Sequence, residues 1–98
     1  MTKELKSHLA TISENLPSLE KTFFVKKIGI FGSVSRGDQT KKSDIDIIVE
    51  FSQPVGFFKF LELEYFLSKI LKKKVDLATK KALKPAIKKD VLKEAIYV

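Results

Sequence analysis

The chain reads IGIFGSVSRGDQTKKSDIDIIVEF from residue 28 to residue 51. Two short apolar runs enclose a polar turn punctuated by glycine, which is typical of two strands and the loop between them. The first run ends in Gly32-Ser33, and the second opens with Asp44 and Asp46. Because successive side chains of a strand alternate between its faces, we expect these two aspartates to point the same way.

Length and composition predict one domain spanning residues 1–98. A chain of this size has room for a single modest core. Its apolar share of 44% and charged share of 32% are ordinary for a soluble globular protein, and no apolar run approaches the roughly 20 residues that cross a bilayer. Without an apolar signal region at the N-terminus, we expect a cytoplasmic protein with no membrane partner. The absence of cysteine excludes disulfides, thiolate metal sites and a cysteine nucleophile.

The net charge of +7 is compatible with an anionic partner. Much of the surplus lies in lysines between residues 72 and 93. Lysines spread along amphipathic helices often form only a solvated face. Nucleotide steering, an acidic protein partner and a solvated surface therefore all remain open.

The spacing of apolar residues predicts the elements around this stretch. Helices are expected at residues 2–16, 57–72 and 83–95, and strands at residues 26–31, 45–51 and 75–78, with an edge strand in the tail 96–98. Thr2 is a plausible cap for the first helix and Pro17 its terminator, followed by a helical turn or loop. The helix at 57–72 is apolar nearly all round, so more than one of its faces must be covered. We expect the core to cover most of it, and a protein partner or self-association to cover the remainder.

The strand directions follow from where the polar residues lie. Gly32-Ser33 ends the first strand and Asp44 and Asp46 open the second, so these groups meet only if the two strands are antiparallel. Asp76, in the third strand, joins them only if the second and third strands are parallel, with the intervening helix as the crossover. We therefore predict an α/β fold, a small mixed sheet with an antiparallel first pair and a parallel second pair, flanked by helices.

Three carboxylates at one sheet edge repel each other, and a divalent cation turns that repulsion into binding. Mg²⁺ prefers oxygen ligands and usually keeps waters and substrate phosphates, so two or three aspartates suit it. Two such ions would activate an attacking oxygen and stabilise a leaving pyrophosphate. Gly32 would let a triphosphate approach the backbone, Ser33 would donate to it, and Arg36 would neutralise its charge.

Each aspartate also has an ordinary structural explanation when taken singly. Asp44 could cap a strand or turn, Asp46 could be a surface carboxylate, and Asp76 could pair with nearby lysines. The combined pattern is more specific than its parts. The sequence contains neither a Gly-Lys-Ser/Thr phosphate loop nor a dinucleotide fingerprint, so phosphate binding would rest on Gly-Ser and metal.

These residues resemble the signature of the polymerase-beta-like nucleotidyltransferases, Gly-Ser followed by ten residues and Asp-x-Asp. Within that superfamily the chain resembles the minimal nucleotidyltransferases, small antitoxins of HEPN-domain toxins. The likeness runs from about Lys27 to the C-terminus and includes Arg36-Gly37 and Val75-Asp76-Leu77.

The resemblance implies that Asp44, Asp46 and Asp76 are metal ligands and catalytic residues, with Asp76 also the base toward the attacking hydroxyl. It implies nucleotide binding at Gly32 and Ser33, and transfer of AMP from ATP to a tyrosine of a cognate HEPN toxin, whose ribonuclease activity is thereby blocked. Mg²⁺ is the implied cofactor, as two ions.

Two further functions compete with this one. The chain could be a non-catalytic antitoxin that silences its partner by stoichiometric contact through helix 57–72 or the basic C-terminal helix. It could also transfer a nucleotide to RNA or to a small-molecule hydroxyl. We do not expect nucleic acid as a direct ligand, because no platform of aromatic and basic residues for a single strand is recognisable.

Overall fold

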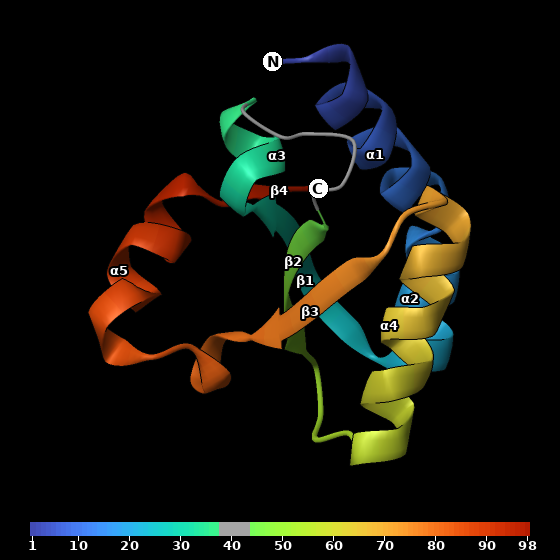
Figure 1. Ribbon diagram of the computed structural model, residues 1–98. Helices are drawn as coiled ribbons and strands as arrows, with labels where there is room; N and C mark the ends of the chain where they lie inside the picture. Colours follow the sequence, from blue (N-terminus) through green and yellow to red (C-terminus); the bar gives the residue numbers. More distant parts are fainter. Residues whose placement is uncertain (38–43) are drawn as a thin grey trace.

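The computed structural model describes residues 1–37 and 44–98 (Figure 1). The polar turn expected at residues 38–43 lies outside the described residues. The helices are α1 (Lys3–Glu14), α2 (Leu16–Phe23), α3 (Gly32–Arg36), α4 (Phe57–Leu71) and α5 (Pro85–Glu94), with a 3-10 turn η1 (Lys80–Ala82). The strands are β1 (Val25–Phe31), β2 (Ile45–Phe51), β3 (Val75–Thr79) and β4 (Ile96–Tyr97).

The strands form one mixed sheet in the order β3-β2-β1-β4. β1 is antiparallel to β2 and β2 is parallel to β3, as the placement of the polar residues predicted. Parallel strands need a long connection, and α4 provides it. β4 pairs with the other side of β1, which confirms the edge strand in the tail. The predicted α/β fold is therefore confirmed.

One face of the sheet carries the hydrophobic core. Helices α1, α2 and α4 pack on this face, to the right of the strands in Figure 1. Alternate strand residues point into the core and are almost fully buried: Ile28, Ile30, Ile45, Ile47, Val49, Val75 and Leu77. The helices contribute residues spaced three or four apart, which form one side of each helix: Leu5, Ile12, Leu19, Leu63 and Leu67.

The opposite face of the sheet is the one that carries the predicted site. Helix α5 lies on that side in Figure 1, apart from α1, α2 and α4, and contacts α3. Asp46 and Asp76 each sit between two core residues of their own strand, so both side chains point toward this face.

The N-terminal helix differs from its prediction at one end. The Thr2 hydroxyl accepts the N–H of Leu5 at 3.1 Å, which confirms the expected cap. The helix ends at Glu14 rather than at residue 16, and Pro17 lies in the first turn of α2. Proline fits a first turn because the N–H that it lacks would have no partner within the helix. Pro17 therefore helps to start a helix, and the prediction that it ends one was wrong.

Helix α4 is covered on one side only. Leu63, Leu67 and Leu71 form its buried face. Four apolar residues on the other side are exposed by 70%, 80%, 39% and 73%, and we call them the α4 stripe: Phe57, Phe58, Leu61 and Tyr65. Core packing thus explains only part of the apolar character of α4. Within the described residues, no helix has the length and apolar character that a membrane crossing needs.

The two sides of α4 predict different costs of truncation. We expect Leu67→Ala, at a fully buried position, to lower the free energy of unfolding by about 2–5 kcal/mol, because it leaves a cavity in the core. The matched change Leu61→Ala, in the α4 stripe, should cost less than about 1 kcal/mol. Urea unfolding followed by circular dichroism measures both, and equal losses would contradict the assigned orientation of α4.

Candidate functional site

Gly32 lies where β1 passes directly into α3, and its backbone is left-handed with φ of +75°. A Cβ added here would collide with Oδ2 of Asp46 and would lie 3.1 Å from its Cγ and 3.2 Å from its Cβ. Both the backbone conformation and the nearby carboxylate therefore favour glycine. The carboxylate of Asp46 rests directly against the turn that ends β1.

The strand register places this carboxylate in a row with its neighbours. Asp46 pairs with Phe31 of β1 on one side and with Asp76 of β3 on the other. Gly32 follows Phe31 directly, and neighbouring strands lie about 4.8 Å apart. Gly32, Asp46 and Asp76 thus form a row across three strands, as the predicted strand directions required.

Asp44 flanks this row immediately before β2. Its Oδ2 lies 4.0 Å from Nζ of Lys74, whose side chain is 81% exposed, so solvent screens the pair. The segments that lead into β2 and β3 are joined here by the N–H of Ile45, which donates to the carbonyl of Lys74 at 2.9 Å. Asp76, for which the sequence left a lysine partner open, makes no ion pair within the described part of the chain. The lysine contact belongs to Asp44 instead.

The surroundings raise the pKa of Asp46 above its ordinary value of 3.8. Partial burial is the largest cause, followed by the negative charges of Asp76 and then Asp44. Arg36 opposes the shift and Glu94 adds slightly to it. The ionised form of Asp46 is therefore disfavoured in the folded chain, because partial burial and the repulsion of its acidic neighbours together exceed the attraction of one arginine.

The carboxylate oxygens of the aspartates are the type of ligand that a hard divalent cation prefers. Mg²⁺ prefers carboxylate oxygens and commonly takes only one or two of them, together with waters and phosphate oxygens. Asp46 and Asp76 are adjacent, and their mutual repulsion, which after burial is the next largest cause of the raised pKa of Asp46, is one that a cation would relieve. Among residues 1–37 and 44–98, no three His, Cys, Asp or Glu side chains form a complete set of ligands. The residues therefore fit an ion that also binds water or phosphate.

Glu94, at the end of α5, also lies at this site, and no sequence motif predicted its place there. Its Oε1 accepts the N–H of Gly32 at 2.9 Å. Nη1 of Arg36 lies 3.2 Å from Oε1 and 3.3 Å from Oε2 of the same carboxylate. One signal was present in the sequence: a negative charge is disfavoured at a helix C-terminus, so an acid that ends a basic helix needs a partner nearby.

Of the six residues that the sequence singled out, the sheet brings Gly32, Asp46 and Asp76 together. Ser33 is the second residue of α3 and shares its turn with Gly32. Arg36 ends the same short helix and is joined to Gly32 through Glu94. All six residues thus lie at one end of the sheet.

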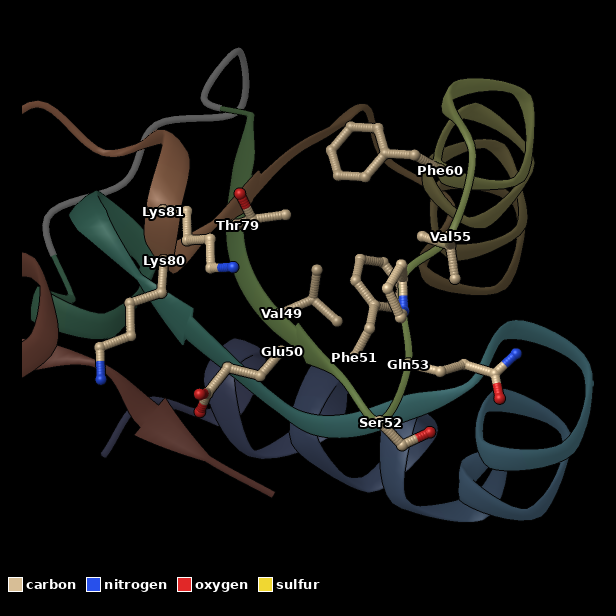
Figure 2. Close-up of a pocket in the computed structure, with 11 residues that line it drawn as sticks. Val49, Glu50, Phe51, Ser52, Gln53, Val55, Phe60, Thr79, Lys80 and Lys81 are labelled. Carbon is tan, nitrogen blue, oxygen red and sulfur yellow. The ribbon is translucent and has the colours of Figure 1, made fainter.

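A separate cleft of about 480 Å³ lies at the other end of β2 and β3. Figure 2 shows Phe51, Val55 and Phe60 on one side of it and Lys80 and Lys81 on the other. None of the six predicted site residues lines this cleft. A second hollow, of about 570 Å³, adjoins Arg36 and Glu94 between α3 and α5.

The chain is similar to known proteins over most of its length. The family model of the nucleotidyltransferase domain matches residues 9–98. A candidate protein adenylyltransferase of Methanocaldococcus jannaschii is 52% identical over 81 residues, which cover 82% of this chain and 83% of the relative. The protein adenylyltransferase MntA of Thermococcus cleftensis is 45% identical over 80 residues, which cover 82% and 81% of the two chains.

Solved structures share the fold. A chain from a toxin-antitoxin crystal structure with AMP-PNP matches with a TM-score of 0.74 and 25% identity, covering 98% of this chain and 72% of that chain. A chain from a complex of a tri-AMPylated Shewanella oneidensis HEPN toxin with an MNT antitoxin matches with a TM-score of 0.68 and 22% identity, covering 95% and 70%. The second likeness shows the fold alone.

The contact at residue 32 predicts that even a single methyl group is costly there. We expect Gly32→Ala to lower the free energy of unfolding by about 1–3 kcal/mol, because the left-handed backbone and the Asp46 carboxylate both oppose a Cβ. The matched change Gly56→Ala meets no atom within 4 Å and should leave stability nearly unchanged. Thermal unfolding of both variants measures the difference, and a fully stable Gly32→Ala protein would contradict the close contact.

The raised pKa of Asp46 predicts a stability gain on neutralising this residue. A carboxyl with a raised folded-state pKa stabilises the fold below its unfolded pKa, and this contribution is lost as pH rises through the folded pKa. Asp46→Asn should therefore be more stable than the parent at pH 7 in the absence of divalent cations. The gain should shrink as pH falls toward 3.8, where the parent also becomes neutral. Urea unfolding across this pH range tests the sign, and a pH-independent difference would contradict it.

Proposed function

This chain belongs to the nucleotidyltransferase domain family, and from this premise we propose that it is a Mg²⁺-dependent protein adenylyltransferase that acts as an antitoxin. It transfers AMP from ATP to a tyrosine hydroxyl of a cognate HEPN ribonuclease toxin and so neutralises the toxin. The observation that carries the proposal is the row of Gly32, Asp46 and Asp76 across three strands. Its two relatives described above, which are named as protein adenylyltransferases, support a protein acceptor.

In the proposed reaction, the tyrosine oxygen attacks the α-phosphorus of ATP. A new P–O bond forms to the tyrosine, the bond between the α-phosphorus and the bridging oxygen breaks, and pyrophosphate leaves. The carboxylate of Asp76, exposed at the start of β3, accepts the proton of the hydroxyl. The toxin-antitoxin structure with AMP-PNP supports a nucleoside triphosphate as the donor.

The proposed roles follow the positions of the side chains. Asp44, Asp46 and Asp76 would hold Mg²⁺, as two ions, which would neutralise the triphosphate and stabilise the leaving pyrophosphate. Ser33, on the turn after β1, donates to the phosphates, and Arg36 adds positive charge beside them. Gly32 keeps the turn free of a side chain, so that phosphate and carboxylate can lie close to the backbone.

We propose further that residues 1–98 form one minimal nucleotidyltransferase domain, which acts in the cytoplasm. The family match to residues 9–98 supports the first point. The cytoplasmic location rests on the sequence, whose N-terminus has no apolar signal region. No membrane or nucleic-acid ligand is needed for this activity.

A second function is favoured by one observation, the exposure of the α4 stripe. Large aromatic side chains in water are unfavourable unless a partner covers them. The chain could therefore silence a partner by contact through α4, independently of the aspartates. Such a binding module would need no nucleotide.

Transfer of radiolabelled AMP from ATP to a candidate partner, the product of the adjacent open reading frame, tests the proposed activity. We expect Mg²⁺-dependent labelling of the partner by the parent protein. Asp44→Ala and Asp46→Ala should each lower the labelling rate by about 100-fold or more, because the metal ligands are removed. Glu20→Ala is the matched control, since it removes an exposed carboxylate of α2 outside the site, and it should label at the parent rate.

Two results would overturn the proposal. One is a parent protein that labels no partner, and the other is full labelling by both aspartate variants. Toxin protection by an Asp44→Ala, Asp46→Ala double variant, lost instead in a Phe58→Ser, Tyr65→Ser variant, would establish the binding module. Labelling of RNA in place of the protein would point to a nucleic-acid acceptor.

A further inference from the structure

Glu94 is held at a fixed place by the elements on both sides of it. It is the last residue of α5, and the N–H of Ala95 still donates to the carbonyl of Val91 at 2.9 Å. The next residue, Ile96, pairs with Ile30 of β1. The backbone at Glu94 is therefore held between α5 and β1, the strand that leads into the turn at Gly32.

From this place the Glu94 side chain holds two groups of the α3 turn at once. One oxygen accepts from the Gly32 N–H, and both oxygens face Nη1 of Arg36. Such charge-assisted contacts fix an arginine in one orientation, because the carboxylate binds the planar guanidinium directionally. The same two groups stand beside the Asp46 carboxylate.

Stability alone does not explain a carboxylate at this position. Glu94 adds a negative charge to a site that already holds three aspartates, and it places that charge at the unfavourable end of a helix. An uncharged acceptor would satisfy the Gly32 N–H without either cost. What the charge adds is its hold on Arg36.

We propose that Glu94 is a positioning residue for nucleotide binding, which orients Arg36 and the Gly32 turn toward the triphosphate. This inference rests on the proposed function. While Glu94 binds the Gly32 N–H, that N–H is not a phosphate donor, so the turn contributes through Ser33 and the oriented Arg36. The C-terminal helix thus sets the shape of the phosphate site without touching the reacting atoms.

Binding of AMP-PNP with Mg²⁺, measured by calorimetry, tests this role together with the KM for ATP and kcat in the transfer reaction. Glu94→Gln keeps an oxygen for the Gly32 N–H and loses the charge that holds Arg36. We expect about tenfold weaker AMP-PNP binding and a similarly raised KM, with a smaller change in kcat. Glu20→Gln is the matched control, since it neutralises an exposed carboxylate of α2 outside the site and should bind as the parent does.

A double-variant comparison separates positioning from a general structural effect. If Glu94 acts through Arg36, Glu94→Gln should weaken binding in the parent but add almost nothing in an Arg36→Gln background. Additive losses would overturn the proposal. Should Glu94→Gln fail to fold, Glu94→Asp keeps the charge but shortens the side chain, and the same weakening is expected.

The outcomes also distinguish this inference from the proposed function. If the parent binds AMP-PNP and Glu94→Gln binds it equally well or more tightly, Glu94 does not position the site, although the nucleotidyltransferase proposal stands. Tighter binding would mean that Glu94 competes with phosphate for Arg36. If the parent itself binds no nucleotide, both the inference and the proposed function fail.

Discussion

The contact between the Asp46 carboxylate and the backbone of Gly32 is the constraint on which the rest of the site depends. It excludes a side chain at residue 32 and coincides with the left-handed backbone that turns β1 into α3. The pairing of Asp46 with Phe31 and Asp76 extends the same alignment across the sheet. A shift of one residue in either register would turn a carboxylate toward the core, so the positions of the three groups are mutually dependent.

Stability and chemistry are divided between the two faces of the sheet. The raised pKa of Asp46 means that the ionised site opposes folding. The opposite face compensates with a core to which only apolar side chains contribute among the buried residues described. This division lets the acidic face retain repulsion that ligand binding would relieve, because most of the buried apolar side chains lie on the other face and only a few, such as Ile48 and Val91, are buried on the acidic side.

The arrangement of the strands could be predicted because polar residues mark the strand ends, and only one set of directions brings Gly32, Asp46 and Asp76 together. The contact of Glu94 could not be predicted in the same way. It joins residues 62 positions apart and depends on where α5 packs against α3. The uncovered side of α4 was equally hidden, since a helix that is apolar nearly all round has no preferred face until its neighbours are known.

The positions of the α4 stripe and the aspartates bear on what kind of acceptor the site can serve. β2 and α4 run in opposite directions in Figure 1, so Phe57 and Phe58 lie toward the end of β2 that is far from Asp46. Along β2 alone, Asp46 is separated from Phe51 by about 17 Å. A small acceptor bound at the aspartates could not also cover these aromatic side chains. A folded protein could do both by reaching around the edge of the sheet, since α4 packs on the face opposite the one that carries the aspartates. Exposed aromatics at one end and carboxylates at the other therefore favour a protein as the acceptor.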